Sequence, residues 1–133
     1  MDTLKILAVD DEEKVLTIIK TFCKNYDITT EQSPFKASER IEQEKFDIFI
    51  IDYQMPQING IELLEQLKEI YDKKKYNYVS IFCTAYGTLH LFKDSFVAGV
   101  FDFFLEKPFE DNDFKNVFNI AVEKLNKITG NQF

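Results

Sequence analysis

Short apolar segments alternate with stretches of helical periodicity along the whole chain, and this alternation constrains the fold more than any other feature. Four runs have the length and near-continuous apolar character of strands buried on both faces, at residues 4–9, 46–51, 78–83 and 100–105. A fifth and more polar run, 28–31, suits a strand at the edge of a sheet. Alternating strands and helices predict a parallel sheet with right-handed crossovers and helices on both faces.

The stretches between these strands carry apolar residues at the spacing of one helix face. The clearest are 15–22 and 114–125, and Gly130 is expected to end the last helix. After Gly87 we expect a helix that turns the following residues inward: Leu89, Phe92 and Phe96. Five strands with five helices favour the doubly wound order 2-1-3-4-5, the flavodoxin-like arrangement of the α/β class.

A chain of 133 residues suits one domain of ordinary size, which we assign to residues 1–128, followed by a short tail at 129–133. Its formal charge of −7 and the lack of a basic stripe argue against direct nucleic-acid binding. The run Lys73–Lys75 is expected to be a solvated helix end.

No apolar run approaches the ~18 residues of a membrane span, and no export signal precedes the first charges. We therefore expect a cytoplasmic protein with no membrane partner. Cys23 and Cys83 lie far apart and outside any metal-ligand spacing, so we expect two buried, reduced thiols.

Reactive or charged residues follow four of the five expected strands. Asp10 and Asp11 follow the first, Asp52 the third, Thr84 the fourth and Lys107 the fifth. In the order 2-1-3-4-5 these strands are consecutive neighbours, and ligands of open α/β sheets bind outside the carboxyl ends of the strands. Each residue alone could be a turn, a cap or a solvated charge. All five at one edge of one sheet predict a single site.

Three carboxylates in one crevice need a counter-charge. Two like charges ~5 Å apart repel by roughly 3 kcal/mol at an effective dielectric constant of about 20, and one lysine cannot offset three such pairs. An all-oxygen site of this kind suits Mg²⁺, with Mn²⁺ as an alternative ion. A cation, a free carboxylate, a hydroxyl and a lysine together favour phosphoryl transfer to the carboxylate.

Four segments resemble the receiver domains of two-component response regulators, and the resemblance spans nearly the whole chain. All four occur in order at receiver spacing, which is far more specific than any one of them. The stretch that begins at Thr84 is most similar to receivers of the nitrogen-regulator class. The segments are Ile6–Glu12, Asp47–Pro56 with Asn59-Gly60, Thr84–Gly87 and Glu106–Phe109.

The resemblance implies a role for each acidic residue of the site. Asp52 would accept a phosphoryl group from a histidine kinase or a phosphotransfer protein. Asp11 would bind Mg²⁺ directly and Asp10 mostly through water. The backbone carbonyl of Gln54 and the Asp52 carboxylate would complete the protein ligands.

The resemblance also implies a switch. Thr84 would move its hydroxyl onto the phosphoryl group, and Lys107, held by a cis bond to Pro108, would pair with a phosphoryl oxygen. An aromatic residue on the fifth strand would then turn inward. This movement would change the face formed by the fourth helix, the fifth strand and the fifth helix.

One departure from the family pattern concerns that aromatic residue. Between Gly99 and Lys107 the chain has one residue more than the usual receiver. Counting back from Lys107 makes Phe104 the switch residue, whereas counting forward from Asp102 makes it Phe103. Because side chains alternate along a strand, we expect a bulge or a displaced loop between Gly99 and Phe104, with Phe104 as the switch.

Gln54 and Tyr86 flank the expected site, two residues beyond Asp52 and Thr84. The resemblance implies that such positions control hydrolysis of the phosphorylated aspartate by admitting or excluding water. The bulk of Tyr86 predicts a long-lived phosphorylated state. The alternative is that Tyr86 only covers the surface of its loop.

We expect a phosphoacceptor rather than an enzyme. An aspartyl-phosphate phosphohydrolase would need a second acid two residues after its nucleophile, where Gln54 stands. A phosphorylation-independent interaction module would typically lack the acceptor, an acidic partner or the lysine, and all are present.

The sequence leaves open whether the regulator is free-standing or excised from a longer protein. Downstream we expect either a protein target or a homodimer through the face of the fourth helix, fifth strand and fifth helix. The residues of that face are His90, Leu91, Phe92 and Phe104.

Overall fold

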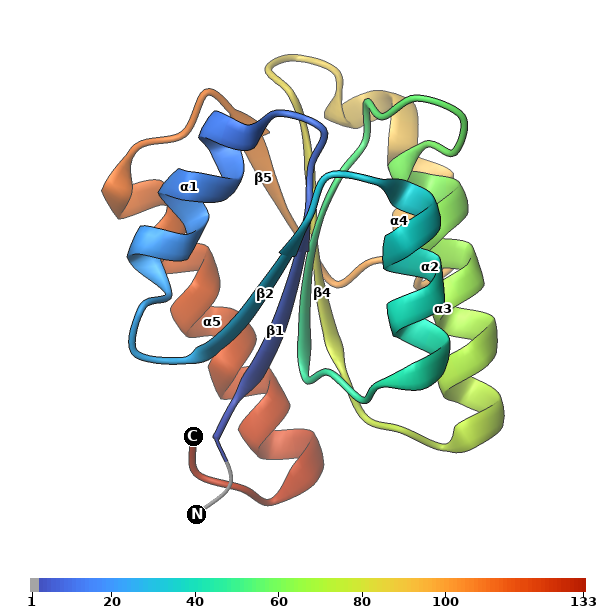
Figure 1. Ribbon diagram of the computed structural model, residues 1–133, viewed down its shortest axis with the longest axis vertical. Helices are drawn as coiled ribbons and strands as arrows, with labels where there is room; N and C mark the ends of the chain where they lie inside the picture. The colour runs from blue at the N-terminus through green and yellow to red at the C-terminus, as the bar shows by residue number, and fades with distance from the viewer. Residues whose placement is uncertain (1–2) are drawn as a thin grey trace.

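Five parallel strands form one sheet in the order β2-β1-β3-β4-β5, which confirms the expected topology. The computed structural model describes residues 3–133, and Figure 1 shows the sheet between two layers of helices. β2 is partly buried at one edge, in agreement with its polar sequence. The strands are β1 Lys5–Val9, β2 Asp27–Glu31, β3 Ile48–Asp52, β4 Val79–Ala85 and β5 Phe103–Lys107.

Helices cover both faces of the sheet. In Figure 1, α1 and α5 lie on one side and α2, α3 and α4 on the other. α5 ends where Gly130 takes a positive φ of 75°, so the expected stop is confirmed. The helices are α1 Glu13–Phe22, α2 Pro34–Gln43, α3 Gly60–Lys74, the 3-10 helix η1 Leu89–Phe92, α4 Lys93–Val97 and α5 Asp111–Thr129.

Successive residues of the central strands contribute to two separate cores. In β3, Ile48 and Ile50 belong to the core under α1 and α5, whereas Phe49 and Ile51 belong to the core under α2 and α3. All four are almost completely buried, as a parallel strand covered on both faces requires. Because strand side chains alternate, Asp52 continues the row of Ile48 and Ile50.

The connection from β3 to α3 is packed tightly against the end of β3. The amide of Gly60 donates to the carbonyl of Tyr53 at 2.8 Å. A Cβ at position 60 would overlap the backbone oxygen of Asp52, so only glycine fits there. Asn59 caps α3 through a reciprocal pair of hydrogen bonds with Glu62. The start of α3 is therefore held against the strand end that carries Asp52.

The segment after Gly87 differs from the single helix that we expected. It forms η1 and the short helix α4, and it ends at Gly99, which has a positive φ of 75°. Phe92 packs against the core as expected. Phe96 is 49% exposed, so its predicted inward position is wrong. The change from 3-10 to α geometry rotates Phe96 away from the direction that one continuous helix would give it.

β5 begins later than expected, at Phe103. From Phe103 to Lys107 it pairs with β4 in unbroken register, so the bulge alternative is wrong for the strand itself. Residues 99–102 are irregular and take up the extra residue as a displaced loop. The side chain of Asp102 holds this loop in place, because it accepts a hydrogen bond from the amide of Ser80 at 2.8 Å.

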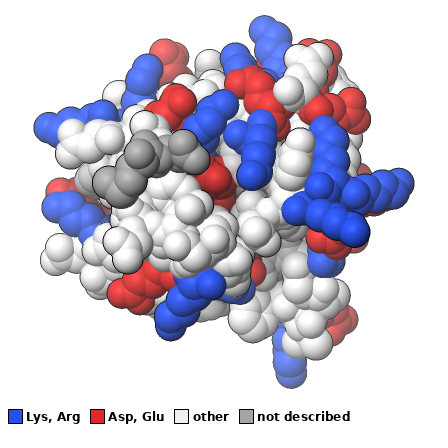
Figure 2. Space-filling view, turned by 90° about the horizontal axis from the view of Figure 1, so that it is seen from below, with Lys and Arg blue, Asp and Glu red and all other residues white. Residues whose placement is uncertain are grey.

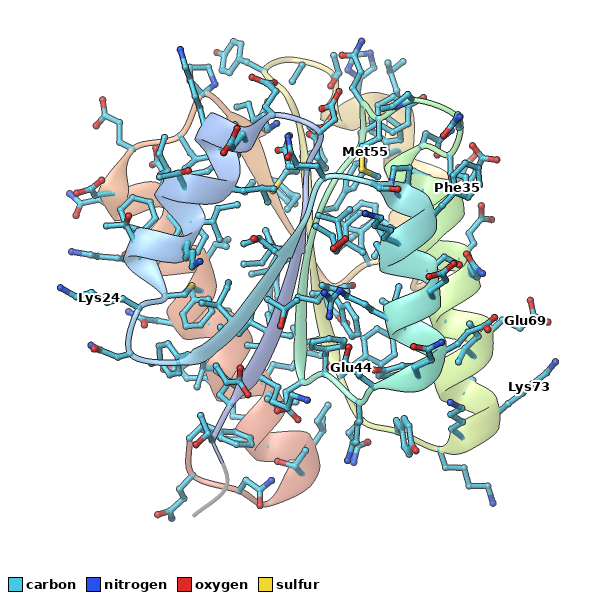
Figure 3. The ribbon with its side chains drawn as sticks, viewed as in Figure 1. Lys24, Phe35, Glu44, Met55, Glu69 and Lys73 are labelled. Atoms are coloured by element: carbon cyan, nitrogen blue, oxygen red, sulfur yellow. The ribbon has the colours of Figure 1, made fainter. Side chains whose placement is uncertain are left out.

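The outer surface carries charges of both signs. Figure 3 shows Glu69 and Lys73 on the outer side of α3, where the Nζ of Lys73 lies 3.3 Å from Oε1 of Glu69. The run Lys73–Lys75 is exposed at the end of this helix, as expected. Figure 2 views the end of the molecule opposite the carboxyl ends of the strands, and acidic and basic side chains lie interspersed there.

Two further expectations concern apolar segments and thiols. Among residues 3–133, every helix is too short or too polar to cross a bilayer. Cys23 and Cys83 are buried free thiols, as predicted. Burial raises the pKa of the Cys23 thiol to about 12, so this thiol stays protonated at neutral pH.

Candidate functional site

One lysine connects two buried carboxylates at the carboxyl edge of the sheet. The Nζ of Lys107 lies 2.6 Å from Oδ2 of Asp10 and 3.0 Å from Oδ1 of Asp52. The two aspartates are only 2% and 5% exposed, so water solvates neither carboxylate well. The ends of β1, β3 and β5 therefore meet at one point, as the strand order predicted.

The local backbone holds each of these side chains. Asp10 directly follows β1, and its Oδ1 accepts a hydrogen bond from the amide of Glu12 at 2.9 Å. Asp52 and Lys107 are the last residues of β3 and β5. The peptide bond between Lys107 and Pro108 is cis, as expected. Each group thus projects from a strand end rather than from a free loop.

Burial changes the protonation chemistry of the site. The pKa of Asp52 rises to about 6, chiefly because the buried carboxylate loses water and also because Asp10 repels it. The same desolvation raises the pKa of Asp10. Burial by itself would lower the pKa of Lys107, but its hydrogen bonds to the two aspartates outweigh that effect and raise it. Lys107 therefore stays cationic between two carboxylates.

The acidic cluster extends from Asp10 toward solvent. One carboxylate oxygen from each of Asp10, Asp11 and Glu12 lies within 4.8 Å of the others. Asp11 and Glu12 are exposed, which leaves room for water ligands. Lys107 pairs with Asp10, Glu12 and Asp52, so the carboxylates that gather here outnumber its single positive charge. Several hard oxygen donors with excess negative charge fit a divalent cation such as Mg²⁺.

Thr84 lies beside the carboxylates but its hydroxyl is engaged elsewhere. It is 2% exposed near the end of β4. Its Oγ1 lies 2.7 Å from Oγ1 of Thr88, in the loop that follows β4. The hydroxyl that we expected at the site is thus present, and it is hydrogen-bonded to another threonine.

A crevice of about 520 Å³ opens beside Asp52. Gln54, Thr84, Lys107 and Pro108 line it together with Asp52, so five of the expected site residues share one cavity. Much of its lining is apolar, and we call these apolar residues its rim; Ile18 on the rim is 45% exposed. The apolar rim residues are Val15, Ile18, Leu91, Pro108 and Phe109.

Phe104 and Phe103 lie on opposite faces of β5. Phe104 is 42% exposed and lines a groove of about 350 Å³ beside η1 and α4. Phe103 packs toward the core under α1 and α5, where the Nζ of Lys124 lies 5.6 Å from its ring centroid. Phe104 is in register with Phe82, and Thr84 follows two residues after Phe82 on the same face of the sheet.

Tyr86 stands away from the carboxylates. Its side chain is 81% exposed, and it is not among the residues that line the crevice beside Asp52. Its amide donates to the carbonyl of Lys107 at 3.0 Å, so its backbone joins the loop after β4 to β5. The long phosphorylated lifetime that we based on its bulk remains a prediction without support from this geometry.

Three residues at the site received no role from the sequence. Glu12 adds a carboxylate, and its position after Asp11 was a readable signal. Thr88 contacts Thr84, and Glu106 accepts a hydrogen bond from the amide of Gly87 at 2.8 Å. The sequence has no signal for these last two contacts, because both depend on how the loop after β4 folds back on the sheet.

Comparison with known proteins gives one consistent family. The chain matches the model of the response regulator receiver domain over residues 6–119. It is 36% identical over 67 residues to the alkaline phosphatase synthesis transcriptional regulatory protein PhoP of Bacillus subtilis, which is 49% of this chain and 28% of PhoP. It is 31% identical over 110 residues to the chemotaxis protein CheY of Listeria monocytogenes, which is 80% of this chain and 88% of CheY.

A solved structure has the same fold as this chain. A CheY-like response regulator receiver domain protein from Methanospirillum hungatei has a TM-score of 0.83 to this chain, with 24% sequence identity. The match covers 96% of this chain and 99% of that one, so the two share the whole fold. The chain spans less than a third of the length of PhoP.

Proposed function

The chain belongs to the family of response regulator receiver domains, and from this membership we propose that it accepts a phosphoryl group on Asp52. The donor would be a phosphohistidine of a sensor histidine kinase or of a phosphotransfer protein. An Oδ atom of Asp52 attacks phosphorus, the bond from phosphorus to the imidazole nitrogen breaks, and the nitrogen keeps the electron pair. The product is an acyl phosphate on Asp52 and a free histidine on the donor.

The observation that carries this proposal is the position of Lys107. Its ammonium lies 3.0 Å from Asp52, within reach of an oxygen of any group attached there. A fixed cation at that place offsets the negative charge that the phosphoryl oxygens bring. Gln54 lines the same crevice and can act neither as general acid nor as general base, which favours holding the phosphoryl group over turning it over.

We further propose that Mg²⁺ is the cofactor, with Mn²⁺ as an alternative. The carboxylates of Asp10, Asp11 and Asp52 and the backbone carbonyl of Gln54 would hold it. When bound, the ion would neutralise charge on the phosphoryl oxygens. The acidic cluster around Asp10 supports this assignment, because its negative charge exceeds what Lys107 can offset.

The apolar rim of the crevice suits the donor. A donor histidine that enters this crevice to reach Asp52 passes its apolar rim, where Ile18 is partly exposed. Ile18 from α1 and Phe109 from the loop before α5 would contact the donor protein around its histidine. Apolar contacts of this kind hold two surfaces together while the charged groups at the centre react.

Phosphorylation would act on the face formed by α4, β5 and α5. Thr84 and Phe104 lie on the same face of the sheet, and Phe104 borders the groove beside α4. Movement of Thr84 toward a phosphoryl oxygen would free space into which Phe104 turns. A downstream protein or a second copy of the chain would read the changed face.

The test is stoichiometric labelling. The chain incubated with Mg²⁺ and acetyl phosphate should gain one phosphoryl group by intact mass, and Asp52→Asn should gain none. Asp111→Asn, at the exposed start of α5, is the matched control and should label like the wild type. Label that persists in Asp52→Asn, or continuous turnover of the donor without a phosphorylated protein, would contradict the proposal.

A further inference from the structure

The hydroxyl of Thr84 is held by a second threonine through a hydrogen bond with a defined direction. The Oγ1 of Thr88 lies 2.7 Å from Oγ1 of Thr84 and donates to the carbonyl of Ala85, also at 2.7 Å. A hydroxyl has one proton to donate. Since the proton of Thr88 goes to Ala85, Thr84 must be the donor in the bond between the two threonines.

This direction matters for the site. A phosphoryl oxygen on Asp52 carries no proton, so it can only accept a hydrogen bond from Thr84. The Oγ1 of Thr88 and a phosphoryl oxygen therefore need the same proton. Thr84 is 2% exposed, so water cannot easily take the place of either acceptor, and its hydroxyl must bond to one or the other.

The loop after β4 is built to keep Thr88 in place. The amide of Thr88 donates to the carbonyl of Ala85 in a turn whose third residue, Gly87, has a positive φ of 81°. The amide of Gly87 donates to the side chain of Glu106, and the amide of Tyr86 donates to β5. The turn brings Thr88 back over Thr84, and the bonds to β5 hold it there.

We infer that Thr88 is a positioning residue that keeps the receiver in its unphosphorylated state by competing with the phosphoryl group for the hydroxyl proton of Thr84. This role rests on the proposed function of Asp52 and Thr84. The contact stabilises the unphosphorylated state, so the bond from Thr84 to the phosphoryl group must offset the loss of the bond to Thr88.

Beryllium fluoride with Mg²⁺ is the probe, because it forms a tetrahedral stand-in for a phosphoryl group on a carboxylate. Thr88→Val keeps the shape of the side chain and removes its hydroxyl. It should bind the probe roughly two- to tenfold more tightly than the wild type, the range that one neutral hydrogen bond supports. Thr88→Ser keeps the hydroxyl and should stay within about twofold of the wild type.

A double-mutant cycle separates this role from a structural one. In a Thr84→Ala background there is no proton to compete for, so adding Thr88→Val should leave affinity for the probe unchanged. A general loosening of the loop would instead act in both backgrounds. Equal affinities of wild type and Thr88→Val would overturn the role of Thr88 while leaving the proposed function intact.

A ligand-free measurement completes the test. Three-bond scalar couplings report the χ1 angle of Thr84 in solution. The wild type should show one rotamer, and Thr88→Val should show averaging over at least two. If the wild type fails to bind beryllium fluoride, the proposed function is wrong, and the couplings still decide whether Thr88 holds Thr84. Averaging already present in the wild type would overturn the inference.

Discussion

The Nζ of Lys107 lies 3.0 Å from Oδ1 of Asp52, although β5 and β3 are not neighbours in the sheet. The lysine side chain crosses the end of β4 to make this contact. The same nitrogen bonds Asp10 beyond it, so one flexible side chain joins the ends of three strands. This relationship makes the stability of the strand ends and the chemistry of the site depend on the same group.

Lys107→Met should destabilise the metal-free protein near neutral pH. The substitution leaves two buried carboxylates without their cation, a change that costs roughly 3–5 kcal/mol when the pair is fully buried. Since Lys107 is partly exposed, we expect about 1–3 kcal/mol. Urea unfolding in the presence of a chelator measures the difference. Lys115→Met, at an exposed position of α5, should change the free energy of unfolding by less than about 0.5 kcal/mol, and equal losses in both variants would refute the expectation.

Asp52→Asn should stabilise the metal-free protein, and the gain should depend on pH. The pKa of Asp52 is about 6 in the folded protein against an ordinary value of 3.8. Between these values the folded state binds more protons than the unfolded chain, so stability falls as pH rises. Asparagine carries no such charge, so the variant should gain about 1–3 kcal/mol above pH ~7.

That gain should shrink as the pH is lowered from about 7 toward about 4, because the folded wild type protonates Asp52 below its pKa of about 6 and so loses the buried charge. Urea unfolding across this range, with a chelator present, measures it. Glu65→Gln is the control, because Glu65 is an exposed carboxylate on α3 outside the crevice. A stability difference for Asp52→Asn that stays constant over the whole range would contradict the role of burial.

Added Mg²⁺ should raise the thermal midpoint of unfolding. A ligand that binds only the folded state adds about 1.4 kcal/mol of stability at tenfold excess over its dissociation constant. Asp11→Asn removes an exposed carboxylate of the acidic cluster and should lose most of this effect, whereas Glu65→Gln should keep it. Calorimetric scans with Mg²⁺ and with a chelator give the comparison, and full stabilisation of Asp11→Asn would argue against a site at the cluster.

Gly60→Ala should disturb the site through the backbone. The added methyl group overlaps the carbonyl oxygen of Asp52, so either α3 or the end of β3 must move. Overpacking of this kind costs roughly 1–3 kcal/mol. Gly130→Ala is the matched control, because its Cβ meets open space and only the positive φ of 75° opposes it, at about 1 kcal/mol.

Acetyl phosphate labelling should fall more strongly in Gly60→Ala than in Gly130→Ala at equal protein concentration. The reason is that Gly60 packs against the backbone of Asp52, the proposed phosphoacceptor, whereas Gly130 lies at the far end of α5. Equal labelling in the two variants would mean that the end of β3 tolerates the shift.

Most of the sheet was predictable because a parallel strand that is buried on both faces must be apolar along nearly its whole length. Ile48 to Ile51 are apolar on both sides of the strand, and the structure buries all of them. The region from Gly87 to Phe103 was predicted less well. Its apolar residues are shared between a groove and a core, so their spacing matches neither a single helix nor a regular strand.

The sequence by itself determined the strand order and, with it, that Asp10, Asp52 and Lys107 meet at one edge. Alternation of apolar runs sets the topology, and topology places strand ends regardless of side-chain detail. Only the tertiary structure decided that Phe104 faces the groove and that Thr88 holds the hydroxyl of Thr84. Both depend on where short irregular loops place a residue, and a shift of one position there reverses a contact without changing the composition or periodicity of the chain.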